Sequence, residues 1–167
     1  MLTGVGGFVV LVASLLPWHA LSVRPTLLRR LSIGFSQNVA GTQGIDGKVA
    51  LLCGVVLVVC AVVMSLAPSA GTYKAMAVIA VVAAVVAGFL MIGDVIGGER
   101  AFAALFRKSV RQFVESHTSF APTDSQLDTF RSAFGIELSL RTGIFVAILG
   151  DLVALIGGAM GLTSRPA

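Results

Sequence analysis

The chain has few charged residues for its length. Asp, Glu, Lys and Arg make up 12% of its 167 residues, about half of the roughly 25% found in average soluble domains. Hydrophobic residues make up 56%, and the mean hydropathy is +0.96. So low a charge density excludes an ordinary soluble domain, and we expect an integral membrane protein in contact with the lipid bilayer. The net charge of +4 does not indicate a nucleic-acid partner, because most Lys and Arg stand between apolar segments, where they set membrane orientation.

Cysteine is also scarce, and the common catalytic motifs are missing. Cys53 and Cys60 are seven residues apart in one apolar segment, so a helix would separate them by roughly 10 Å, too far for a disulfide. Together with Met64 and Met91 they would suit Cu(I), but small packing cysteines are the simpler interpretation. Since the chain has no phosphate loop, zinc-ligand motif or GxSxG element, we expect no cofactor, no metal and no enzymatic activity.

Long apolar segments, by contrast, are abundant. A helix that crosses a membrane needs about 20 residues, with a range of roughly 17 to 25, and four segments qualify: residues 2–18, 49–67, 75–97 and 143–162. Lipid cannot satisfy exposed backbone groups, and the alternation typical of barrel strands is absent. The sequence therefore predicts an all-α fold: a four-helix transmembrane bundle forming a single domain, with Trp18 and Tyr73 at the headgroup level.

The positive charges predict the orientation of this bundle. The two long connections, residues 19–48 and 98–142, lie on one side of it and hold most Lys and Arg: Arg24, Arg29, Arg30, Lys48, Arg100, Arg107, Lys108, Arg111, Arg131 and Arg141. The opposite side has only Lys74 and Arg165. The positive-inside rule then places the long connections in the cytoplasm and both termini outside.

The connection 98–142 has the pattern of an amphipathic helix followed by a second, shorter one. Apolar residues recur at helical spacing between Arg100 and His117, which is expected to cap the helix: Phe102, Phe106, Val110, Phe113 and Val114. Charged side chains occupy the other side. The second helix is expected to begin at Thr123, Asp124 or Ser125 and to present Leu127, Phe130 and Phe134.

We expect this amphipathic segment to lie at the membrane interface and to dock on lipid, on the bundle or on another membrane protein. The expected docking residues are Phe102, Phe106, Arg107, Lys108, Arg111, Phe113, Phe130 and Phe134. In the first connection, RPTLLRRLSIGF (24–35) suits the same interface, whereas SQNVAGTQGIDG (36–47) is turn-rich and predicts irregular structure.

Two aspartates interrupt the apolar segments, and each lies on a stripe of mostly small residues. The stripe in segment 75–97 consists of Ala80, Ala84, Ala87, Met91 and Asp94, and the stripe in segment 143–162 consists of Ala147, Asp151, Ala154, Gly158 and Gly161. Small side chains allow close helix packing in membranes, so both aspartates should face protein on neighbouring antiparallel helices.

The expected depths of Asp94 and Asp151 differ by only roughly 6 Å, so their carboxyls are candidates for an intramembrane pair. Such a pair would share a proton and could relay protons or bind a cation. The alternative is that each Asp only fixes helix packing. His19 is a possible relay member, although an interfacial histidine in contact with headgroups is the simpler interpretation.

The segments LLPWHALSV (15–23) and GIDGKVALLCGVVLVV (44–59) resemble small actinobacterial four-span membrane proteins of unknown function. In that family an LPW-type span end and a DGK-type re-entry flank an outward loop. The resemblance covers the first third of the chain and implies an outside first connection, contrary to the charge pattern. It assigns no functional residue.

Two functions are compatible with these features. The first is a non-catalytic accessory or assembly subunit of a larger membrane complex, which binds other membrane subunits or a second copy of itself. The alternative is a small proton- or cation-coupled transporter that uses Asp94 and Asp151. Sequence patterns do not identify a partner or a substrate.

Overall fold

The computed structural model describes residues 1–23, 35–67 and 69–163. The elements follow in the order α1 (Leu2–Leu15), β1 (Pro17–Val23), β2 (Phe35–Ala40), the 3-10 helix η2 (Gly41–Gln43), α2 (Ile45–Leu66), α3 (Ala70–His117), α4 (Asp124–Ala133), β3 (Ile136–Leu140) and α5 (Thr142–Thr163). They form two compact units. We call residues 1–18, 40–95 and 141 onward the bundle unit, and residues 19–39 and 96–140 the polar unit.

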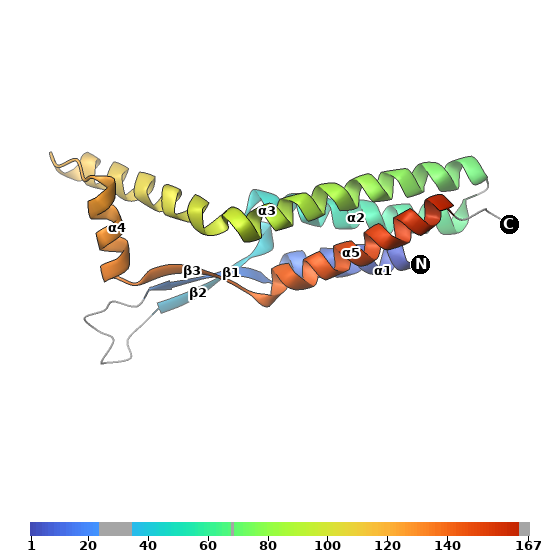
Figure 1. The fold of residues 1–167 in the computed structure, drawn as a ribbon, viewed down its shortest axis with the longest axis horizontal. Helices are drawn as coiled ribbons and strands as arrows, with labels where there is room; N and C mark the ends of the chain where they lie inside the picture. Colours follow the sequence, from blue (N-terminus) through green and yellow to red (C-terminus); the bar gives the residue numbers. More distant parts are fainter. Residues whose placement is uncertain (24–34, 68, 164–167) are drawn as a thin grey trace. The chain divides into compact units, whose positions relative to one another are not determined.

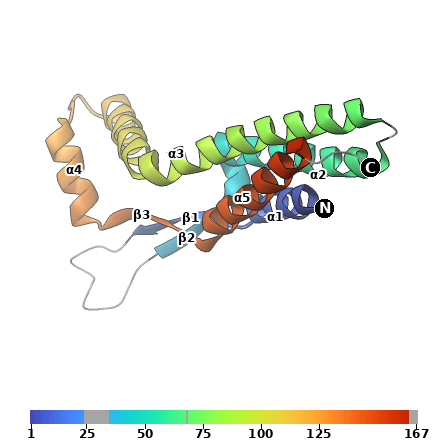
Figure 2. The ribbon, with the colours of Figure 1, turned by 45° about the vertical axis from the view of Figure 1, so that its right-hand side comes forward.

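In the bundle unit, α1 packs against both α2 and α5, and the three helices run side by side (Figures 1 and 2). Two adjacent glycines of α1 make this possible. A Cβ atom at Gly6 would collide with the backbone of α5 at Gly150 and Ala154, and one at Gly7 would lie 2.6 Å from Cβ of Leu57 in α2. The glycines therefore set the distance between α1 and each neighbour.

The bundle unit is built with small residues inside and large apolar residues outside. Its buried residues are mostly alanine and glycine, and both predicted stripes are buried apart from half-buried Asp94. Large side chains such as Phe8 and Phe89 are exposed instead. This distribution is typical of helices packed in lipid, where apolar surface gains nothing from burial.

Three described helices are long and apolar enough to cross a membrane: α2, α3 and α5. The predicted segments 49–67 and 143–162 correspond to α2 and α5. The segment 75–97 is helical as predicted, but α3 continues without a break to His117. The prediction of a separate amphipathic helix beginning near Arg100 is therefore wrong, because the glycines at 97 and 98 do not end α3.

The first predicted span, residues 2–18, is shorter than expected. Helix α1 ends at Leu15, and its 14 residues extend roughly 21 Å, less than the roughly 30 Å of a hydrocarbon core. Pro17 explains the end of the helix, since a residue before proline avoids the α conformation. Leu16 accordingly has φ −78° and ψ 162°.

Trp18 is buried inside the protein. Its side chain is 1% exposed, and its Nε1 donates a hydrogen bond to the carbonyl oxygen of Ala13 at 2.9 Å. The indole also covers Gly41, where a Cβ atom would lie 2.5 Å from the ring. Trp18 therefore packs on protein at the end of α1, and its predicted position at the headgroup level stays a prediction.

The described chain is mostly helical, as predicted for an all-α fold. The polar unit adds a small three-stranded sheet with the order β2-β1-β3, which was not predicted. Strands β1 and β3 are antiparallel, with His19 opposite Leu140 and Val23 opposite Ile136. The prediction that residues 36–47 are irregular is wrong, because all of them except Gly44 belong to β2, η2 or the start of α2. Most of RPTLLRRLSIGF, with Arg24, Arg29 and Arg30, lies outside the described residues, as does Arg165.

Candidate functional site

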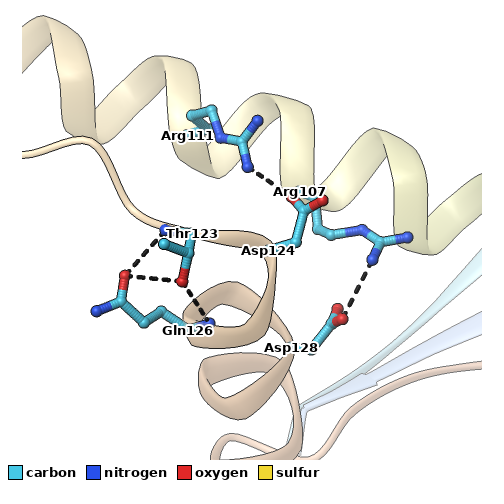
Figure 3. Close-up of polar contacts among 6 residues, drawn as sticks. All are labelled: Arg107, Arg111, Thr123, Asp124, Gln126 and Asp128. Carbon is cyan, nitrogen blue, oxygen red and sulfur yellow. Dashed lines mark hydrogen bonds and ion pairs between the residues drawn. The ribbon is translucent and has the colours of Figure 1, made fainter.

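Two ion pairs with matching spacing join α3 to α4 in the polar unit. Arg107 donates to Asp128 at 3.1 Å and Arg111 pairs with Asp124, so residues four apart on one helix meet residues four apart on the other (Figure 3). A third pair links Arg131 to Glu99 at 3.3 Å. Exposed ion pairs contribute less than about 1 kcal/mol each to the stability of a protein. These pairs therefore matter more for the alignment of α3 with α4 than for the free energy of folding.

Aromatic side chains fill the space between the same helices. Phe106 of α3 stacks on Phe130 of α4 with ring centroids 6.5 Å apart, and Phe102 and Phe134 extend the row at either end. The guanidinium carbon of Arg131 lies 5.6 Å from the centroid of the Phe102 ring, a cation–π contact. The four phenylalanines were predicted to dock on a partner, and in the structure they pack α4 on α3.

A capping box fixes the start of α4. The amide of Gln126 donates to Oγ1 of Thr123 at 3.4 Å, and the amide of Thr123 donates to Oε1 of Gln126 at 2.9 Å (Figure 3). Of the three predicted starting residues, Thr123 is the cap. Leu127 is buried, as expected of the apolar face of this helix, and His117 bonds to the carbonyl of Phe113 at the end of α3.

Replacing Thr123 by Ala should destabilise α4 by about 1 kcal/mol, because the amide of Gln126 loses its acceptor. Hydrogen exchange in detergent should show faster exchange of the first amides of α4 in this variant. Thr129→Ala is the matched control, since its hydroxyl bonds only to the carbonyl of Ser125 within the helix. Equal exchange rates in the two variants would contradict the assigned cap.

An open cleft of about 650 Å³ lies between α3, α4 and β3. Its charged lining residues are Glu99, Arg107, Asp128, Arg131 and Glu137. No histidine or cysteine is among the described residues that line it. A second hollow of about 430 Å³ is lined by Arg107, Lys108 and Arg111, together with Glu115 and Asp124.

The apolar residues of α3 in the polar unit differ in exposure. Phe102 and Phe106 are half-buried and face α4, whereas Phe113 is 64% exposed. Leu105 is 63% exposed and lies about 80° around the helix from Phe113. Leu105 was not predicted, because it lies outside the stripe that contains Phe102, Phe106 and Phe113. We call the exposed apolar residues Leu105, Phe113 and Phe120 of this segment the apolar patch.

Asp151 lies inside the bundle unit and is 4% exposed. A Cβ atom at Gly88 of α3 would be 2.7 Å from its Oδ2, so Gly88 is the residue opposite Asp151. Contacts of Gly158 with Val81 fit the same antiparallel register. Asp94 then lies six residues beyond Gly88, roughly 9 Å along the axis, which is further than the sequence predicted for an Asp pair.

The remaining predicted residues occupy separate places. His19 lies in β1 rather than at the end of a helix, and its role in a relay stays a prediction. Cys53 packs beside Met91 in one cluster of the bundle, and Cys60 packs with Leu57 in another. In the described ranges, no three His, Cys, Asp or Glu side chains gather where they could hold a metal ion.

Comparison with known proteins adds no functional assignment. No protein-family profile matches the chain, and no curated protein matches it with significance.

Proposed function

We propose that this protein is a non-catalytic membrane subunit that holds a docking unit at the membrane surface. The bundle unit would anchor it in the bilayer, and the polar unit would bind another membrane protein. The observation that carries the proposal is the apolar patch on α3, where Leu105 and Phe113 are each more than 60% exposed in a segment rich in charged residues.

The contacts between α3 and α4 in the polar unit support this role. Three ion pairs and a row of four aromatic rings position α4 on α3, so the patch is presented by a pre-ordered surface. Pre-ordering reduces the entropy lost on binding. Exposed Phe and Leu side chains next to charged residues are typical of protein interfaces with an apolar centre and a polar rim.

We place the docking unit on the cytoplasmic side of the membrane, because the connections that contain it hold most of the Lys and Arg. Cysteines introduced at exposed positions of α4 should then be modified by an impermeant maleimide only after the cells are opened. Modification in intact cells would reverse this orientation.

Leu105→Glu should abolish recovery of the partner when the tagged protein is purified in mild detergent from the cells that make it. A charge in the centre of an apolar interface typically costs several kcal/mol, which corresponds to more than 100-fold in affinity. Ala104→Glu is the matched control, because the neighbouring residue is also exposed but points about 100° away around the helix. Loss of the partner in both variants, or in neither, would contradict the proposed patch.

The alternative function, a proton- or cation-coupled transporter built on an Asp pair, has less support. Gly88, and not Asp94, is opposite Asp151. A relay between the two aspartates would have to bridge the roughly 9 Å along α3 that separates Gly88, opposite Asp151, from Asp94.

A further inference from the structure

Asp151 is in an unusual place for an ionisable side chain. The buried polar residues of the described chain are Thr3, Ser14 and Asp151, so Asp151 is the one residue among them that can carry a charge. It lies within α5, one of the three helices long and apolar enough to cross a membrane. An ionised carboxylate at such a site costs several kcal/mol unless a positive charge or hydrogen bonds compensate it.

Hydrogen bonds do not provide that compensation. Oδ1 of Asp151 is buried and has no hydrogen-bond partner in the described part of the chain. The residue opposite Oδ2 is Gly88, which has no side chain to donate a hydrogen bond. Its backbone amide is inside the continuous helix α3, where amides bond to the preceding turn.

Positive charges do not provide it either. No Lys, Arg or His is among the buried residues of the described ranges. The titratable group of α2 that interacts with Asp151 is the thiol of Cys53, which cannot carry a positive charge. A metal ion is not favoured, because no group of three His, Cys, Asp or Glu side chains is found in these ranges.

A proton remains as the compensating charge. We propose that Asp151 is a proton-binding site within the membrane bundle and that the folded protein carries this side chain as a neutral carboxylic acid at neutral pH. Gly88 belongs to the site, because even a methyl group at this position would lie within 2.7 Å of Oδ2. This site is independent of docking and needs no partner for its test.

Infrared spectroscopy of the full-length protein in lipid vesicles tests the site directly. The wild-type spectrum at neutral pH should contain the C=O band of a protonated carboxylic acid, which shifts in D2O and on 13C labelling of the aspartate carboxyls. Asp151→Asn should remove this band, and the matched variant Asp94→Asn should retain it. Absence of the band from the wild-type protein, or its persistence in Asp151→Asn, would overturn the proposal.

A second measurement does not depend on the folding of a variant. Dicyclohexylcarbodiimide enters bilayers and reacts with protonated carboxyls, leaving a stable adduct that peptide mass spectrometry can locate. We expect the adduct on the α5 peptide that contains Asp151 in wild-type vesicles at neutral pH. Adducts confined to other carboxyls of the chain would overturn the assignment. Gly88→Ala should lower the yield at Asp151 at least several-fold, because the added methyl group displaces the carboxyl.

Discussion

Gly6→Leu should unfold the bundle unit more effectively than any other single change at a glycine of α1. A Cβ atom at this position would collide with the backbone of α5 at Gly150 and Ala154, and a backbone cannot move aside as a flexible side chain does. Overpacking typically costs 1 to 3 kcal/mol, and we expect about 3 kcal/mol here. The reactivity of Cys60, which is 3% exposed, should rise roughly 100-fold.

The rate of maleimide modification of Cys60 in mild detergent measures this effect, with Cys53 replaced by Ala. Gly93→Leu provides the control, since a Cβ atom at Gly93 would have no neighbour within 4 Å. Cys60 of this variant should be modified at the wild-type rate. If Cys60 of Gly6→Leu is also modified at the wild-type rate, the close packing of α1 on α5 is wrong.

Trp18→Ala should destabilise the bundle unit by about 3 to 5 kcal/mol, as is typical for the truncation of a buried aromatic residue. The change removes the ring that covers Gly41 and the hydrogen bond from Nε1 to the carbonyl of Ala13. The carbonyl would then be left at the end of α1 without its side-chain donor. Modification of Cys60 should accelerate more than 100-fold.

Phe89→Ala is the matched control for this prediction. Phe89 is also aromatic and apolar, but it is 78% exposed and would face lipid. Its loss should leave the rate at Cys60 nearly unchanged. Similar rates for the two variants would contradict the buried packing of Trp18 against Gly41 and Ala13.

The long apolar helices could be predicted from the sequence because lipid imposes a simple rule on length and composition. The stripes of small residues also identified the buried faces of α3 and α5, since Ala87 and Ala154 are fully buried. The sheet was missed because its strands lie almost entirely outside the apolar segments, with β2 and most of β1 in the first connection. Alternation in IELSL (136–140) was the available signal for β3.

The candidate site was predicted in composition but not in geometry. The amphipathic pattern identified Phe102, Phe106 and Phe113 but could not show that Phe106 packs on α4 while Phe113 stays exposed. The arginines of RKSVR (107–111) and the aspartates of DSQLD (124–128) are each four residues apart, and this matching spacing was the available signal for how α3 and α4 are aligned. The position opposite Asp151 could not be read from one sequence, because it depends on how α3 and α5 are aligned.

The most direct test of the docking proposal is photo-crosslinking in the membranes of cells that make the protein. A photoreactive phenylalanine at position 113 should form one discrete adduct with another membrane protein. The same residue at position 89, on the lipid-facing side of α3, should form none, and Leu105→Glu should remove the adduct at 113. Crosslinks from position 113 to lipid alone, or to many proteins without preference, would contradict the proposal that the apolar patch binds a specific partner.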